Sequence, residues 1–157
     1  MPKVYHLDLE KKDLKGAKVA LLPGDPGRVE GIARAVAAEY GTISKRLASK
    51  REFTTYLSSF NGNNLIVTST GIGGPSASIA IDELAQLGVT AFIRVGTTGA
   101  IQEFIKDGDC VITTGSVRLD GASTHYAPIE YPAVADHCLT NALVKGAKDT
   151  LAILSNS

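Results

Sequence analysis

The chain has 157 residues, of which 44% are hydrophobic, and this length and composition predict one globular domain over residues 1–157. The 16 basic residues balance 16 acidic ones, and a net charge of zero argues against a nucleic acid or a membrane surface held by bulk charge. No apolar run could span a bilayer, and the N-terminus lacks the apolar core of a signal peptide, so we expect a cytoplasmic protein.

The two cysteines, Cys110 and Cys138, lie far apart in the sequence and match no zinc or redox spacing. We expect both to be small buried residues of a protein in a reducing compartment. The three histidines, His6, His125 and His137, have no partners at metal-ligand spacing, so we expect no metal site built on them.

The first expected elements are a strand, a turn and a helix. Residues 18–22 form a short apolar run that is typical of a buried strand. Asp25 is a capping residue type, and Pro26 after it favours the first position of a helix. Apolar residues then recur at helical spacing and predict one buried face: Val29, Ile32, Ala33, Val36 and Ala37.

A hairpin and a second helix follow. Residues 53–60 and 64–69 are strand-like, and Asn61-Gly62 between them is a hairpin signal. Pro75 begins the second helix and Gly88 ends it. Its buried stripe is predicted to hold Ala80, Leu84 and Leu87, with Asp82, Glu83 and Gln86 off the stripe.

The last expected elements are two strands and a helix. Residues 90–95 and 109–114 are apolar runs that predict strands. Asp136 is the expected N-cap of the third helix. One face of that helix is predicted to carry Leu139, Ala142, Leu143, Gly146 and Ala147.

Strands that alternate with helices predict an α/β layer fold, and the hairpin makes its central sheet mixed. In such folds, ligands bind beyond the carboxyl ends of the strands. Gly24, Gly71 and Gly96 each lie just past an expected strand end. Glycine lets backbone N–H groups approach an oxyanion closely, so these turns predict one shared anion site.

Two arginines strengthen the prediction of an anion site. Arg28 lies in the first turn of a helix, where the positive end of the helix dipole disfavours a cation unless an anion is bound. Arg94 ends an apolar strand, where an unpaired charge is costly. The alternatives are a solvated Arg28, or one paired with Glu30, and an Arg94 in a buried ion pair.

Several common motifs are missing from the sequence. The glycines at 71, 73 and 74 do not have the spacing of a dinucleotide fingerprint, and no P-loop pattern occurs. No Gly-x-Ser-x-Gly elbow is present, so nothing indicates a serine or cysteine nucleophile.

The chain resembles the bacterial uridine phosphorylases of the nucleoside phosphorylase family. The resemblance extends from Tyr5 to about Lys148 and is carried by five stretches in order: Leu22–Val29, Arg51–Thr55, Ser69–Ser76, Arg94–Gln102 and Ser116–Ser123. Glu83–Gly88 and Arg118–Ser123 favour a uridine phosphorylase over a purine nucleoside phosphorylase. The resemblance implies a three-layer α/β sandwich with a mixed central sheet. It also implies reversible phosphorolysis of uridine to uracil and ribose 1-phosphate.

The resemblance also implies the roles of particular residues. Arg94 and Thr97 would be the catalytic positions. Phosphate would be held by Gly24, Arg28, Arg51, Arg94 and Thr97, with Arg51 reaching the phosphate of a neighbouring subunit. His6 would reach the neighbour's ribose 5′-hydroxyl, and Tyr5 and Thr97 would line the ribose site.

The family further implies a homo-oligomer, a dimer or a hexamer, whose ligands are phosphate and a pyrimidine nucleoside. Glu52, Ile72 and Ser76 would hold a monovalent cation, a structural potassium ion, at the dimer interface. No organic cofactor is expected.

This sequence departs from the family pattern in three ways. The segment between Arg28 and Arg51 is a few residues longer, and Lys50 stands where the family has histidine. The residues after Lys148 stop following the pattern, and the chain ends before the segment that reads uracil and part of the ribose. We therefore expect a sandwich that is incomplete at its C-terminus.

Two other interpretations remain open. One is a non-catalytic short paralogue that binds phosphate or joins full-length subunits, and the other is a nucleosidase relative that uses water in place of phosphate. The three arginines at positions 28, 51 and 94 argue against a nucleosidase, because a neutral water molecule does not need three cationic side chains to bind it.

Overall fold

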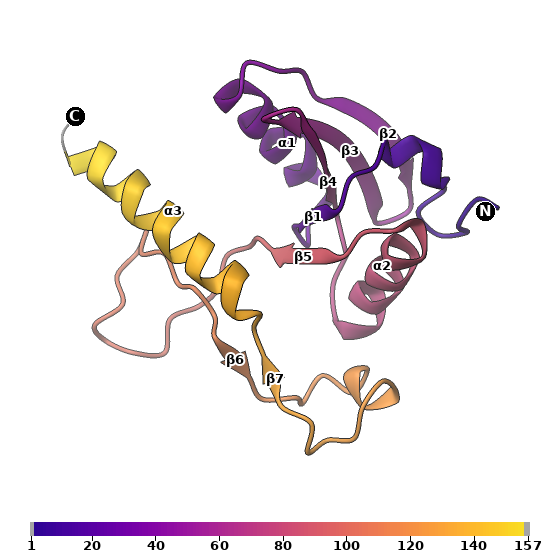
Figure 1. Cartoon of the computed structure of the whole chain (residues 1–157). Helices are drawn as coiled ribbons and strands as arrows, with labels where there is room; N and C mark the ends of the chain where they lie inside the picture. Colours follow the sequence, from indigo (N-terminus) through magenta and orange to yellow (C-terminus); the bar gives the residue numbers. More distant parts are fainter. Residues whose placement is uncertain (1, 156–157) are drawn as a thin grey trace. The chain divides into compact units, whose positions relative to one another are not determined.

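A computed structural model describes residues 2–155 of the chain, and the side chains of residues 2–151. The chain divides into two compact units, Met1–Thr97 and Thr98–Ser157, and each is described here by itself (Figure 1). That residues 1–157 form one domain therefore stays a prediction from the sequence. No helix in the described part of the chain is long and apolar enough to cross a membrane.

The N-terminal unit is built on a five-stranded mixed sheet, as the sequence predicts. The strand order is β2-β3-β4-β1-β5. β1 runs parallel to both β4 and β5, whereas β2, β3 and β4 form antiparallel pairs. The strands span Val19–Leu22 (β1), Lys45–Lys50 (β2), Phe53–Phe60 (β3), Asn63–Thr68 (β4) and Ala91–Arg94 (β5).

The turn between β3 and β4 confirms the predicted hairpin. Phe60 pairs with Asn63, so the loop holds two residues only. Asn61 and Gly62 both have positive φ, 46° and 76°, which is the backbone of the type I′ turn that Asn-Gly favours.

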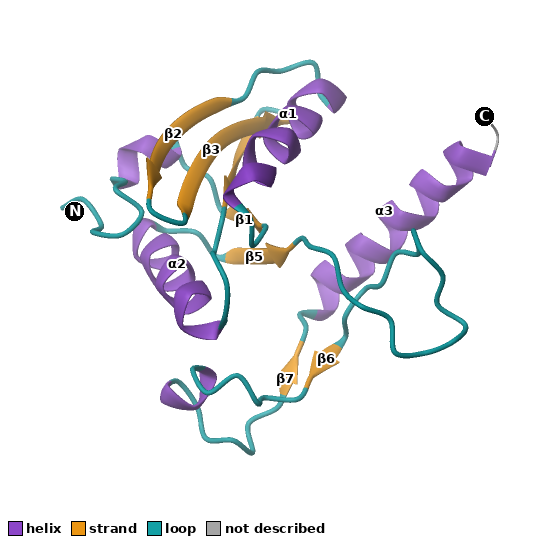
Figure 2. Ribbon diagram, turned by 180° about the vertical axis from the view of Figure 1, so that it is seen from behind, coloured by secondary structure: helices purple, strands orange, loops and turns teal. Residues whose placement is uncertain are grey.

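Helices cover both faces of this sheet. α1 (Val29–Glu39) packs on one face, and α2 (Gly74–Leu87) packs on the other together with the 3-10 helix η1 (Lys11–Leu14). The two views agree on this arrangement (Figure 2). The predicted apolar face of α1 is confirmed, because Val29, Ala33 and Ala37 are buried and Ile32 and Val36 pack beside them.

The alternation of side chains along the strands divides the core into two halves. On β1, Val19 and Leu21 face α1, whereas Ala20 and Leu22 face α2. On β4, Val67 packs toward α1. The cluster beneath α2 is the larger and includes Phe53, Leu57, Ile66, Ala80, Leu84 and Leu87. This is the helix–sheet–helix layering of an α/β sandwich.

The helix boundaries follow the expected residues. Asp25 Oδ1 accepts a hydrogen bond of 2.8 Å from the Gly27 amide, and Pro26 opens the short helix η2 (Pro26–Arg28) that leads into α1. Gly88 ends α2 with a φ of 104°, in the left-handed region that side chains other than glycine rarely adopt.

The prediction that Glu83 lies off the buried stripe of α2 is wrong. Glu83 is 8% exposed and accepts hydrogen bonds from the amides of His6 and Leu7. The N-terminal segment lies against α2 and covers a position that the helical pattern alone assigns to solvent. Burial of this carboxylate is tolerated because the segment supplies donors for it.

The C-terminal unit has little packed core. It contains a two-stranded ladder, β6 (Gly115–Ser116) with β7 (Ala133–Val134), the 3-10 helix η3 (Ser123–His125) and the long helix α3 (His137–Ser155). Asp136 caps α3 as predicted, because its Oδ1 accepts from the Leu139 amide at 2.8 Å. The predicted apolar face of α3 is largely exposed: Ala142 and Leu143 are exposed, and Leu139 and Ala147 are half-buried.

Two predictions for the C-terminal unit are wrong. Residues 109–114 form no strand, and Val111 is 52% exposed, because a strand needs a paired neighbour and only residues 115–116 find one. Cys110 and Cys138 are exposed free thiols rather than buried residues. Both lie in the unit where no second layer covers the apolar side chains.

Arg118 organises the loop between β6 and β7. The side chain is 8% exposed, and its hydrogen bonds to the described residues all go to oxygen atoms of its own loop. Nε bonds Ser123 Oγ, Nη1 bonds the carbonyls of Pro128 and Tyr131, and Nη2 bonds the carbonyls of Ser123 and Ala127. Five donors therefore fix the path of residues 118–131.

Asp120 stabilises the same loop through hydrogen bonds to its carboxylate. Its carboxylate accepts from the Ser123 hydroxyl and amide and from the Ala122 amide, all at 2.7 Å. The hydrogen bonds from Ser123 and then from Ala122 lower the pKa of Asp120 from 3.8 to about 2. Because the folded pKa lies below the unfolded one, this contribution to loop stability is present above about pH 4 and disappears toward pH 2.

We expect the amide proton shifts of Ala122 and Ser123 to titrate with a midpoint near pH 2. NMR titration measures this directly, and Asp120→Asn should abolish the step. Asp107→Asn, at another exposed carboxyl of the same unit, is the matched control and should leave the step in place. A midpoint close to the ordinary value of 3.8 would show that the hydrogen bonds to Asp120 do not form in solution.

Candidate functional site

A cavity of about 600 Å³ opens in the N-terminal unit beyond the carboxyl ends of three parallel strands. It is lined by residues of the turns after β1 and β4, the first turns of η2 and α2, the end of β5 and the turn between β2 and β3: Gly24, Asp25, Pro26, Glu52, Gly71, Ile72, Gly73, Ser76 and Arg94. This is the edge of an α/β sheet where ligands bind. The expectation that the turns after different strands share one cavity is confirmed for Gly24 and Gly71, whereas Gly96 does not line the cavity.

Backbone hydrogen bonds hold the turns together. The Thr70 amide donates to the Pro23 carbonyl at 2.9 Å, and the Gly71 amide donates to the Gly24 carbonyl at 3.0 Å. These bonds continue the β1–β4 pairing past the end of both strands. The rim of the cavity is therefore part of the sheet framework rather than a loose loop.

Arg94 carries the positive charge of the cavity. Its Nη1 donates to the carbonyls of Leu22 at 2.8 Å and Val95 at 3.0 Å. A methyl group added at Gly24 would lie 2.9 Å from Nη2, so the guanidinium rests directly against the Gly24 backbone. Glycine at position 24 gives the arginine room to lie over the end of β1.

The guanidinium of Arg94 has no acidic partner within 4 Å among the described residues. The alternative of a buried ion pair is therefore wrong, and Arg94 itself is exposed. Its charge is fixed in direction by two carbonyls and is not neutralised by a carboxylate. A cation held this way is suited to an anion that enters the cavity.

The other wall of the cavity carries Glu52, Ile72 and Ser76. Ser76 Oγ donates to the Thr70 carbonyl at 2.6 Å and lies 3.4 Å from Glu52 Oε1. A methyl group at Gly71 would lie 2.7 Å from Ser76 Oγ and 2.9 Å from Glu52 Cγ, so this corner is tightly packed. The Ile72 side chain is 98% exposed.

The oxygen atoms of this corner fit a monovalent cation by their chemistry. One carboxylate, one hydroxyl and neighbouring carbonyls are hard donors of the kind that bind potassium. No group of three or more His, Cys, Asp or Glu side chains in the described part of the chain is placed to bind a metal ion.

Three of the predicted phosphate residues do not line the cavity. Arg28 ends η2, Arg51 lies in the turn between β2 and β3 with a φ of 54°, and Thr97 follows β5. All three are exposed. Arg28 has no ion pair with Glu30, whose carboxylate instead binds Arg34 at 2.5 Å. The alternative of an Arg28–Glu30 pair is thus wrong, whereas the exposure of Arg28 agrees with the alternative of a solvated side chain.

The predicted ribose residues Tyr5 and His6 lie on the N-terminal segment, outside the cavity lining. The His6 ring packs edge-on to Tyr5, with centroids 5.0 Å apart, and its Nδ1 lies 2.7 Å from Glu83 Oε1. Tyr5 is 66% exposed. Within one chain these residues do not line the Arg94 cavity, and their role toward a neighbouring subunit stays a prediction.

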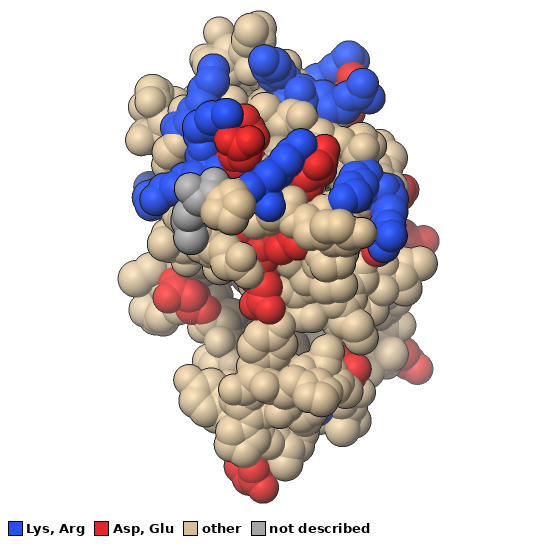
Figure 3. All heavy atoms as spheres, turned by 90° about the vertical axis from the view of Figure 1, so that its right-hand side faces the viewer, with Lys and Arg blue, Asp and Glu red and all other residues tan. Residues whose placement is uncertain are grey.

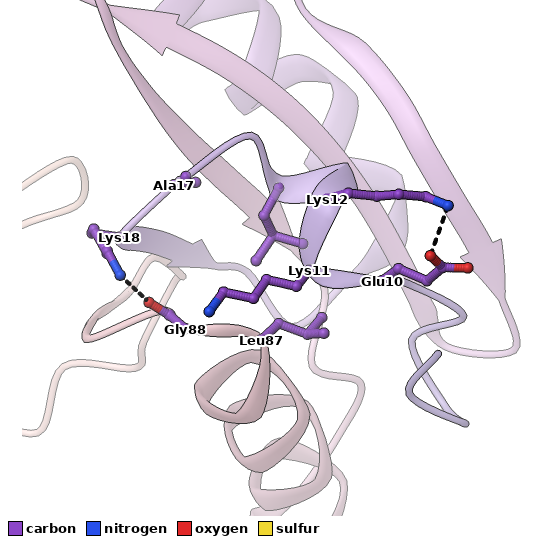
Figure 4. A pocket seen from close by; sticks show the side chains of 9 residues that line it. Glu10, Lys11, Lys12, Ala17, Lys18, Leu87 and Gly88 are labelled. Atoms are coloured by element: carbon purple, nitrogen blue, oxygen red, sulfur yellow. Dashed lines mark hydrogen bonds and ion pairs between the residues drawn. The ribbon is translucent and has the colours of Figure 1, made fainter. Parts of the chain in front are cut away.

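A second cavity, of about 450 Å³, contains none of the predicted site residues (Figure 4). Lys11 and Lys18 lie beside Gly88, and Lys18 Nζ donates to the Gly88 carbonyl at 3.1 Å. Lysines at the carbonyl end of α2 interact favourably with the helix dipole, which accounts for their placement.

Charges of both signs lie on the face of the molecule that Figure 3 shows. Where lysine and arginine side chains gather, acidic side chains lie among them (Figure 3). Lys3 pairs with Asp8 and Lys12 pairs with Glu10, each at 2.8 Å. This face therefore offers no large one-signed field for a nucleic acid.

The N-terminal unit is an α/β layer fold with a cavity at the carboxyl edge of its sheet, and comparison with known sequences identifies the class. The sequence profile of the Phosphorylase superfamily matches residues 18–154, and the chain belongs to this superfamily.

Among its relatives are uridine phosphorylases. The chain is 58% identical over 145 residues to the uridine phosphorylase of Escherichia coli and 57% identical to that of Salmonella typhimurium. Each match covers 92% of this chain and 55% of the relative. The guanosine phosphorylase of Halorubrum lacusprofundi is 42% identical over 149 residues, covering 95% of this chain and 59% of the relative. The chain thus spans a little over half the length of these relatives.

Proposed function

We propose that this chain forms the phosphate-binding part of a uridine phosphorylase active site. The observation that carries the proposal is the Arg94 guanidinium, which two backbone carbonyls hold in place at the cavity and which no acidic side chain among the described residues neutralises. The relatives that match most of this chain at 57–58% identity, uridine phosphorylases, support the choice of reaction. Phosphate is the anion that such a reaction requires in this cavity.

In the proposed reaction, a phosphate oxygen forms a bond to the anomeric carbon of the ribose. The bond from that carbon to N1 of uracil breaks, and its electron pair leaves with the base, which then takes up a proton. The products are ribose 1-phosphate and uracil. Arg94 would fix the phosphate below the anomeric carbon, and the negative charge of the bound phosphate would stabilise the oxocarbenium-like transition state.

Gly24, Arg28 and Thr97 are proposed to complete the phosphate site from the turns after β1 and β5. Arg51, exposed in the turn between β2 and β3, is proposed to reach the phosphate of a neighbouring copy. Tyr5 and His6 are proposed to reach the neighbour's ribose. Glu52, Ile72 and Ser76 are proposed to hold a monovalent cation, potassium, whose charge would be structural.

The choice of base is proposed not to be set by the cavity at Arg94. A guanosine phosphorylase matches the same region at 42% identity, so this region can serve a purine or a pyrimidine site. The cavity described above accordingly offers groups for phosphate.

We expect Gly24→Ala to weaken phosphate binding about tenfold while the protein stays folded. The new methyl group would lie 2.9 Å from Arg94 Nη2, and the flexible arginine must move away from the cavity. Isothermal titration calorimetry with inorganic phosphate measures the change. Gly31→Ala in α1 adds the same methyl group where nothing lies within 4 Å and should leave the affinity unchanged. Equal affinity for phosphate in the two variants would contradict the assignment of Gly24 to the phosphate site.

We also expect the chain to self-associate. The residues assigned to a neighbour, Tyr5, His6 and Arg51, have no substrate group to meet within their own chain. Several large apolar side chains are exposed, among them Ile101 at 94%, Val117 at 83% and Leu119 at 84%. Light scattering should report a mass of at least two chains. A monomer that persists at high concentration would contradict the proposed shared site.

A further inference from the structure

The carboxylate of Glu83 has an unusual set of partners. It accepts from the His6 amide at 2.9 and 3.0 Å and from the Leu7 amide at 2.8 Å, and it also meets His6 Nδ1 at 2.7 Å. These partners hold the N-terminal segment onto α2. The phosphate cavity does not use Glu83, and the helical pattern gave no reason to expect it in any site.

The hydrogen bond to Glu83 decides which ring nitrogen of His6 carries the proton. Burial raises the pKa of Glu83, but the bonds from the Leu7 and His6 amides and from the His6 ring outweigh it, and the net pKa is lowered. The carboxylate is therefore ionised at neutral pH and can only accept. His6 Nδ1, 2.7 Å away, must be the donor and must carry a proton. In the neutral ring, Nε2 then has a free lone pair.

The ring is also held in direction. Its edge meets the rings of Tyr5 and Phe53, with centroid distances of 5.0 and 6.4 Å. Lys50 Nζ lies 4.1 Å above the Tyr5 ring and donates to the Tyr5 carbonyl. Lys50 on β2 and Glu83 on α2 thus hold the backbone on either side of the imidazole.

The outward nitrogen is available for a ligand. The His6 side chain is 33% exposed, and Nε2 makes no hydrogen bond to the described residues. A neutral Nε2 accepts a hydrogen bond but cannot donate one. A hydroxyl group that donates its proton to Nε2 is the matching partner.

We propose that Glu83 is a positioning residue that acts through His6: it fixes the Nδ1–H tautomer, so that Nε2 accepts the hydrogen bond of a ribose 5′-hydroxyl. This inference rests on the proposed function for the ribose and on the hydrogen bonds above for the tautomer. Because Glu83 touches only the protein, it contributes by orienting His6 and by setting its acceptor, as second-layer carboxylates do for other histidines.

The first test needs no variant. The 157-residue chain is labelled with ¹⁵N, and the two-bond ¹⁵N–¹H correlations of His6 are recorded at a pH where the ring is neutral. We expect the pattern of a single Nδ1–H tautomer. A pattern of the Nε2–H tautomer would overturn the inference, whatever the protein binds.

The second test uses Glu83→Gln. Glutamine keeps the size of the side chain but has one oxygen, so either the Leu7 amide or the His6 Nδ1–H must face an NH₂ group. We expect the single-tautomer pattern to be lost and the amide exchange of His6 and Leu7 to become faster. Glu39→Gln, at an exposed position at the end of α1, changes the same charge and should leave both unchanged.

Binding separates this inference from the proposed function. We expect Glu83→Gln to weaken ribose 1-phosphate binding about tenfold, the loss of roughly one well-placed hydrogen bond, and to leave inorganic phosphate binding unchanged. Unchanged ribose 1-phosphate affinity would overturn the role of Glu83 in the ribose site. If the wild-type chain binds neither phosphate nor ribose 1-phosphate, the proposed function fails and the ribose role of Glu83 falls with it. The tautomer measurement still decides whether Glu83 positions His6.

Discussion

Replacing Arg94 by alanine should weaken the binding of inorganic phosphate by roughly ten- to a hundredfold. Hydrogen bonds to charged groups contribute about 1.5–3 kcal/mol, and each 1.4 kcal/mol is about a factor of ten in affinity. Arg94 can deliver this full effect because no acidic side chain among the described residues neutralises it. Its two carbonyl bonds, to Leu22 and Val95, also fix its direction before the anion arrives.

Two controls make the calorimetric result specific. Arg34→Ala removes the same charge from an exposed arginine of α1, which pairs with Glu30, and should leave phosphate affinity unchanged. Arg94→Lys keeps the charge but loses the planar fork, so we expect an affinity between those of the alanine variant and the wild type. Thermal unfolding of each variant checks that the fold is retained. Equal phosphate affinity in Arg94→Ala and Arg34→Ala would contradict the assignment of the cavity.

The N-terminal unit could be predicted from the sequence because its signals are local. The helical spacing from Val29 to Ala37 describes the buried face of α1, and Asn61-Gly62 has the φ angles that a two-residue hairpin requires. Pro26 begins the helix η2, and Gly88 ends the helix α2. Gly24 and Arg94 could be brought together because parallel strands end at the same edge of a sheet.

The misses occurred where one segment depends on another that is distant in sequence. Glu83 looks like a solvent-facing residue until the N-terminal segment covers it, and no periodicity records that covering. β2 (Lys45–Lys50) is too polar to be read as a strand, although it pairs along β3 at the edge of the sheet. The apolar run at 109–114 and the two cysteines were expected to be buried, but no layer in their own unit covers them.

Lys50 illustrates how a departure from a family pattern becomes interpretable once its contacts are known. In the sequence it is only a lysine where the resemblance leads us to expect histidine. In the structure its ammonium group lies over the Tyr5 ring and binds the Tyr5 carbonyl. The long cationic side chain of Lys50 thus holds the segment that carries His6. The sequence around Lys50 does not predict this contact, because Tyr5 lies far away along the chain.

The last expected result is that the purified 157-residue chain releases uracil from uridine very slowly, even with saturating phosphate. Phosphorolysis needs an anchored phosphate and also a base whose developing negative charge is stabilised. The cavity at Arg94 offers a fixed charge for phosphate, whereas residues 1–157 match only 55% of the length of the uridine phosphorylases that they resemble. Donors aimed at developing charge commonly contribute about 10²–10³ each in rate, and losses in positioning the ribose add to this.

Uracil release with and without phosphate, by the wild-type chain and by Arg94→Ala, measures this directly. A slow, phosphate-dependent release that Arg94→Ala abolishes would fit a chain that anchors phosphate but does not stabilise the leaving base. Phosphate binding with no release at all would favour the non-catalytic paralogue. A turnover on the order of 1–10³ per second, the usual range of enzymes, would instead mean that self-association of this chain builds a complete base site, and the expectation of a poor catalyst would be wrong.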